Sequence, residues 1–82
     1  MGLDRQTKRA VIAAANELSD LNDKDFADRY KELSNSGRFT VPQCFILFRL
    51  AETYVRVKRG ELSREQGLKS QKDILELEVE EI

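Results

Sequence analysis

The sequence contains no histidine and only one cysteine among its 82 residues. Without histidine, the chain lacks the side chain that most often serves as a general base and as a metal ligand. A single cysteine, Cys44, forms no internal disulfide and supplies no Cys–His zinc site. Because Cys44 lies in the most apolar segment, we expect a buried, reduced thiol in a cytoplasmic protein.

Pairs of carboxylates at helical spacing are the remaining candidates for catalysis, as in Asp25 with Asp28 and Glu76 with Glu80. We expect these pairs to lack the enclosing apolar surroundings that general acid–base work by a carboxyl group requires. The chain also has neither a Gly-rich phosphate-binding pattern nor an EF-hand calcium loop. The sequence therefore predicts a protein that is not an enzyme and that needs no cofactor and no metal.

Long apolar runs are absent as well. No segment approaches the 18 or so uninterrupted apolar residues of a membrane span, so we expect no membrane partner. The first ten residues, MGLDRQTKRA, lack the apolar core of a secretory signal. Gly2 is followed at position 6 by Gln6 rather than Ser or Thr, which does not fit the myristoylation motif.

The charges are nearly balanced in number but unevenly distributed along the chain, with a net charge of −1. Residues 38–72 carry eight basic and three acidic side chains, whereas residues 73–82 carry five acids and no base. The sequence thus has a basic middle and an acidic end. An acidic tail that folds back would neutralise the middle, and the net charge itself directs the chain to no polyanion.

The segment 40–59 contains the strongest structural signal of the chain. Ten of the fourteen residues from 44 to 57 are apolar, and at helical spacing they cover more than half of the circumference. Thr40 and Gln43 form a capping box, and Pro42 is tolerated in the first turn. We expect a helix over 41–59 that serves as the central element of a compact, all-α, four-helix domain.

Three further helices are predicted, over 4–18, 23–34 and 64–77. Asp4 and Asn22 or Asp23 are suitable N-caps, and the last helix follows a second capping box after the short turn that begins at Gly60. The last two helices therefore form an αα-hairpin. The domain covers residues 1–77, followed by an acidic tail over 78–82. The inward-facing positions are predicted to include Val11, Ala14, Ala15, Leu18, Phe26, Tyr30, Leu33, Leu68 and Leu75, while Gly67 is predicted to cost about 1 kcal/mol relative to alanine.

The polar stripe of the 41–59 helix is the first candidate for a protein-binding surface. It holds Arg49, Glu52, Thr53, Arg56 and Arg59, together with one aromatic residue. An exposed aromatic beside arginines is typical of interface hot spots, so we predict protein binding by Phe45, Arg49 and Arg56. In the alternative, the 34–39 loop or the first helix covers Phe45, and the two arginines pair with Glu52.

The C-terminal segment is the second candidate. Leu75, Leu77 and Val79 alternate with glutamates, and an extended segment of this kind can add a strand to the sheet of a partner. The same residues can instead prolong the last helix and pair with a second copy through Leu68, Leu75 and Ile82, which are seven residues apart. A solvated acidic end is the third possibility.

A nucleic-acid-binding regulator is the alternative function. Its candidate residues are the basic side chains around the turn of the αα-hairpin. Within the last helix, acids one turn away are expected to neutralise Lys69 and Lys72, and the pI of about 5.5 is low for such a protein. The sequence therefore favours a small non-catalytic interaction module: an adaptor, an inhibitor or a self-associating subunit. The residues of the alternative site are Arg38, Arg56, Lys58, Arg59 and Arg64.

Overall fold

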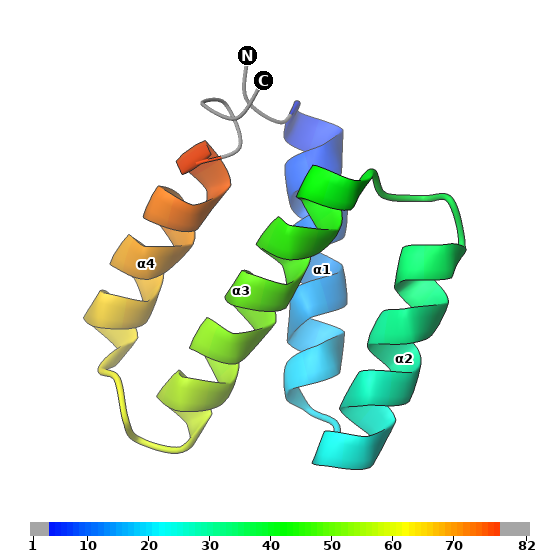
Figure 1. Ribbon diagram of the computed structural model, residues 1–82. Coiled ribbons are helices and arrows are strands. Elements are labelled where there is room, and N and C mark those ends of the chain that lie inside the picture. Colours follow the sequence, from blue (N-terminus) through cyan, green and yellow to red (C-terminus); the bar gives the residue numbers. More distant parts are fainter. Residues whose placement is uncertain (1–3, 78–82) are drawn as a thin grey trace.

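The computed structural model describes residues 4–77, and this part of the chain consists of four helices with no strand (Figure 1). This confirms the all-α fold. No helix within residues 4–77 is long and apolar enough to cross a lipid bilayer. The helices are α1 (Arg5–Ser19), α2 (Asp23–Asn35), α3 (Val41–Lys58) and α4 (Arg64–Leu77).

The N-terminus of each helix is fixed by the cap that the sequence predicts. The carboxylate of Asp4 accepts a hydrogen bond from the backbone N–H of Thr7, and this bond lowers the pKa of Asp4. The side chain of Asn22 accepts from the backbone N–H of Asp25. Both capping boxes are formed in both directions, between Thr40 and Gln43 and between Ser63 and Gln66.

Helix α3 occupies the centre of the molecule. In Figure 1, α4 and α2 lie on opposite sides of α3, and α1 lies behind it. α3 packs against all three other helices, and α1 also packs against α2. The arrangement leaves one side of α3 uncovered, between α2 and α4.

The core is formed where α1 and α3 meet. Leu18 of α1 and Leu47 and Leu50 of α3 are completely buried, and small side chains lie beside them. Alanines at such positions let two helix backbones approach closely, so that large side chains from each helix fill the space around them. The buried apolar cluster consists of Val11, Ala14, Ala15, Leu18, Leu33, Phe39, Cys44, Ile46, Leu47, Leu50, Ala51, Ile74 and Leu75.

The structure corrects the predicted position of Thr53. The helical spacing placed this residue on the polar stripe of α3, but it is buried. Its hydroxyl donates a hydrogen bond of 3.0 Å to the backbone carbonyl of Arg49, one turn earlier. That bond satisfies the hydroxyl within the helix, so Thr53 packs inward at little cost.

The structure also corrects the inner face of α4. Leu68 was expected to point inward but is 57% exposed, whereas Ile74 and Leu75 are buried. Gly67 is buried instead, where α4 packs against α3. A Cβ atom at position 67 would lie 2.5 Å from Cγ2 of Val57. The glycine, predicted only to weaken the helix, permits the contact between the two helices of the αα-hairpin.

The substitution Gly67→Ala tests this contact. We expect it to lower the free energy of unfolding by about 1–2 kcal/mol, because the added methyl group overpacks against Val57. In a Val57→Ala background the same substitution should be neutral or stabilising by up to about 1 kcal/mol, since alanine favours the helix and the clash is gone. Urea denaturation of the unmodified protein, the two single variants and the double variant measures the coupling free energy between positions 57 and 67. An equal effect of Gly67→Ala in both backgrounds would contradict the close approach.

Tyr54 links the same two helices through a polar contact. Its hydroxyl donates a hydrogen bond to the side-chain oxygen Oε1 of Gln71 on α4. The ring is partly buried against the core. Burial raises the pKa of Tyr54 above its ordinary value, because the charged phenolate is poorly solvated there.

Alkaline titration tests the environment of Tyr54. The chain has two tyrosines, so in a Tyr30→Phe variant Tyr54 is the only source of phenolate absorbance. We expect its phenolate absorbance to appear at a higher pH in the folded protein than in the same variant unfolded in urea. The raised pKa means that the neutral phenol contributes stability below its ordinary pKa, and that this contribution disappears as the pH rises through the folded value. Identical titration curves in both states would refute the effect of burial.

Candidate protein-binding site

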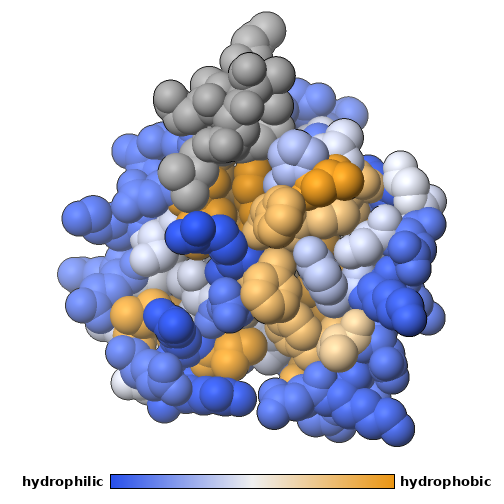
Figure 2. All heavy atoms as spheres, in the orientation of Figure 1, coloured by the Kyte–Doolittle hydropathy of each residue, from blue (hydrophilic) through white to orange (hydrophobic). Residues whose placement is uncertain are grey.

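The uncovered side of α3 carries exposed aromatic side chains. Phe45 is 65% exposed and Phe48 is 36% exposed. Figure 2 shows apolar side chains gathered at the centre of this face, over α3, with polar side chains on both flanks. The alternative in which α1 or the 34–39 loop covers Phe45 is therefore wrong.

A groove between α3 and α4 runs beside Phe45. It encloses about 680 Å³, and Leu62 and Ile74 add apolar surface to it. Phe45, Arg49 and Arg56, the three residues of α3 that the sequence predicted for protein binding, all line this groove. α4 contributes a carboxylate, Asp73, on the opposite side.

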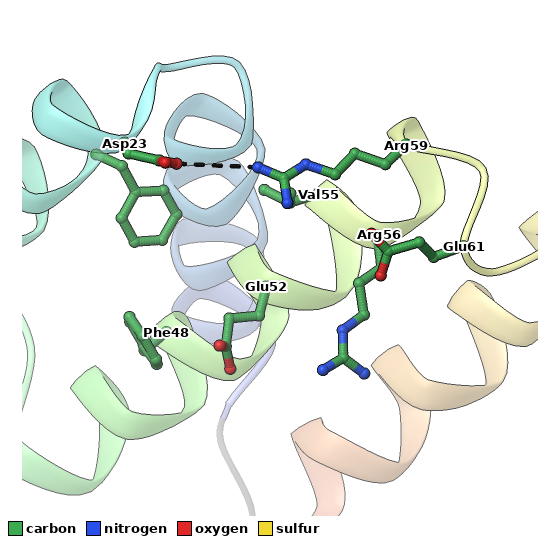
Figure 3. A pocket seen from close by; sticks show the side chains of 8 residues that line it. Asp23, Phe48, Glu52, Val55, Arg56, Arg59 and Glu61 are labelled. Carbon is green, nitrogen blue, oxygen red and sulfur yellow. Dashed lines mark ion pairs between the residues drawn. The ribbon is translucent and has the colours of Figure 1, made fainter.

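A second groove, of about 420 Å³, lies between α2 and α3. Figure 3 shows Phe48, Glu52 and Arg56 following one another along α3, with Arg59 reaching toward Asp23 on α2. The guanidinium of Arg59 lies 3.9 Å from the carboxylate of Asp23. Phe48, Glu52 and Arg56 line both grooves, so they form the ridge between them.

Phe48 is a site residue that the sequence reasoning missed. It is one of the ten apolar residues from 44 to 57, which the sequence pattern indicated to be structural, and it was not among the predicted binding residues. In the structure its ring packs against two rings of α2, those of Phe26 at 5.9 Å and Tyr30 at 5.3 Å between centroids. These contacts hold Phe48 in place while part of its surface stays exposed. Its position three residues after Phe45, at the edge of the polar stripe, is the one signal of this that the sequence offered.

Within the described residues, the charged side chains of Arg49, Glu52 and Arg56 on the uncovered side of α3 form no ion pair with one another. Within residues 4–77, neither Arg49 nor Arg56 comes within 4.0 Å of the carboxylate of Glu52. The bracketing of Glu52 by the two arginines was the expected alternative, and it is not formed. All three side chains are exposed and remain available to a binding partner.

Of the basic residues of the alternative nucleic-acid site, four flank the turn between α3 and α4, whereas Arg38 lies at the other end of α3. Lys58 pairs with Asp20 and also donates to the hydroxyl of Ser19. Arg38 lies over the ring of Phe39, before the first residue of α3. α3 has 18 residues and so separates Arg38 from the hairpin turn by about 27 Å. Among the described residues, the pairs expected to neutralise the last helix are also not formed: Glu65 with Lys69, Lys69 with Asp73, and Lys72 with Glu76.

The structure describes only part of the C-terminal candidate segment, up to Leu77. Leu75 is helical and buried, which corrects the expectation that it belongs to an extended, accessible strand. Leu77 is the last residue of α4, and Val79 lies outside the described residues. The alternative seam is also interrupted, because Leu68 is exposed while Leu75 is buried, and Ile82 lies outside the described residues.

The uncovered side of α3 thus carries two aromatic rings, those of Phe45 and Phe48, together with the guanidinium groups of Arg49 and Arg56 and the carboxylate of Glu52. In residues 4–77, no three side chains of the metal-binding types gather closely enough to hold an ion. Comparison of the chain with protein-family models, with curated proteins and with solved structures finds no match. The geometry of α3 and its two grooves therefore carries the functional interpretation.

Proposed function

We propose that this protein is a small, non-catalytic interaction module that binds another protein chain through the exposed side of α3. We call this surface the contact face and define it by Phe45, Phe48, Arg49, Glu52 and Arg56. The exposure of Phe45 beside two arginines that lack an ion pair with Glu52 is the observation that carries the proposal. Aromatic residues and arginine are enriched among the residues that dominate binding energy at protein interfaces.

The support beneath the contact face also favours binding. Leu47 and Leu50, on the opposite side of α3, are completely buried, so the helix is held firmly by the core. Phe48 is further restrained by the rings of Phe26 and Tyr30. A surface that is already ordered loses less conformational entropy on binding, which leaves more of the contact energy as affinity.

Nucleic-acid binding receives less support. Lys58 and Arg59 are each engaged by an aspartate of the α1–α2 region, and Arg38 lies at the far end of α3. The net charge of −1 provides no long-range attraction to a polyanion. The buried thiol of Cys44 fits a reducing compartment, so the proposal places the protein in the cytoplasm.

Site-specific photo-crosslinking tests the proposed function. A photoreactive phenylalanine analogue at position 45, introduced in the native host, should form covalent adducts with a protein. Arg56→Ala should reduce the yield of these adducts by about tenfold or more, because it removes a hot-spot side chain from the contact face. The adducts are measured by gel electrophoresis and identified by mass spectrometry.

The matched control places the same photoreactive residue at Ala13, which is exposed on α1, the helix behind α3. This probe should give few or no adducts. Equal adduct yields from positions 13 and 45 would mean that the contact face has no special role. Adducts with nucleic acid in place of protein, lost as the salt concentration rises, would favour the alternative function.

A further inference from the structure

The contact face has a pattern that is complementary to itself. Four of its five residues follow one another along α3 as Phe45, Arg49, Glu52 and Arg56, and at about 100° per residue these four lie within about 60° of one another around the helix. Their positions are symmetric about the point between Leu50 and Ala51. Arg49 and Glu52 lie equally far from this point, on opposite sides of it. The same holds for Phe45 and Arg56.

We infer that the contact face binds a second copy of this chain, in a two-fold symmetric dimer whose two α3 helices run antiparallel. The inference rests on the proposed function and identifies its partner. A two-fold axis through the midpoint of the face places Arg49 of one copy at the level of Glu52 of the other. It places Phe45 of one copy at the level of Arg56 of the other. Because the interface is isologous, each contact occurs twice.

Each of these contacts is favourable by itself. A guanidinium and a carboxylate form a charge-assisted hydrogen bond, and Arg49 and Glu52 make no ion pair with each other within the described chain. A guanidinium over an aromatic ring forms a cation–π contact, and the ring of Phe45 is sufficiently exposed to accept Arg56. The dimer therefore supplies partners for both arginines, the glutamate and the exposed ring.

The charges of the contact face also favour this antiparallel register over other arrangements of the two α3 helices. Moving the two-fold axis to Glu52 would bring this carboxylate against its own copy. A parallel dimer would bring Arg49 against Arg49 and Arg56 against Arg56. Like charges at such close approach are destabilising, so the antiparallel register centred between Leu50 and Ala51 is the one that matches opposite charges.

The shape of the face agrees with a helix docking across it. The ridge of Phe48, Glu52 and Arg56 has a groove on each side, and the larger groove offers the apolar surfaces of Leu62 and Ile74. Two helices pack by placing the ridge of one into the groove of the other. In Figure 2 the polar side chains lie on the flanks of the apolar centre, as in an interface with an apolar core and a polar rim.

Charge reversal followed by mixing tests the dimer. Analytical ultracentrifugation of the unmodified protein should give the mass of two chains, in a concentration-dependent equilibrium. Arg49→Glu and Glu52→Arg should each raise the dissociation constant by about tenfold or more, because each replaces both ion pairs by like-charge contacts. An equimolar mixture of the two variants should dimerise again, since every charge then faces its opposite. The double variant, with both reversals in one chain, should dimerise for the same reason.

Matched controls distinguish the loss of the ion pairs between Arg49 and Glu52 from a general effect of the changed net charge. Arg9→Glu on α1 and Glu65→Arg on α4 reverse exposed charges outside the contact face and should leave the dissociation constant within about threefold of the unmodified value. Circular dichroism checks that all variants are folded. A monomeric unmodified protein at concentrations up to about 0.5 mM, or a mixture that stays monomeric, would overturn the dimer. If the protein is monomeric while a probe at position 45 still labels a different protein, the proposed function stands and only its assigned partner is wrong.

Discussion

The contact between α1 and α3 is the interaction on which the rest of the structure depends. Leu18, Leu47 and Leu50 are completely buried there, and this burial decides which side of α3 faces the core. Only one rotation of α3 about its axis buries both Leu47 and Leu50 against α1. That rotation determines the direction in which every other side chain of α3 points. The exposure of Phe45 is thus a consequence of core packing at the opposite side of the same helix.

Small residues set how closely the other helices approach this core. Gly67 lets α4 pack against Val57 of α3, because a Cβ atom at position 67 would lie 2.5 Å from Cγ2 of Val57. Larger side chains hold α2 at the other side, where Phe26 and Tyr30 pack around Phe48. The grooves on the two sides of α3 therefore differ in volume, about 420 Å³ beside α2 and about 680 Å³ beside α4, and the contact face lies between α2 and α4.

The charges of α3 are used in two different ways. At the C-terminal end of α3, Lys58 pairs with Asp20, the C-cap of α1, and the capping residue Arg59 pairs with Asp23, the first residue of α2. These pairs connect the end of α3 to the turn between α1 and α2. Such exposed pairs contribute little stability, but they engage the basic groups that first indicated nucleic acid. Along the middle of α3, Arg49 and Glu52 make no ion pair within the described residues, which gives the contact face its distinctive charge pattern.

Local chemistry made the helices predictable from the sequence alone. The caps at Asp4, Thr40 and Ser63 depend on residues three positions away, so no tertiary contact is needed to recognise them. Helical spacing also identified Phe45, Arg49 and Arg56 as one stripe. The spacing did not determine which part of that stripe α2 or α4 covers. It gives the direction in which each side chain leaves the helix axis, but not how close the neighbouring helix lies. The burial of Thr53, the exposure of Leu68, the half-exposed position of Phe48 and the role of Gly67 were therefore decided only by the packing of α2 and α4 against α3.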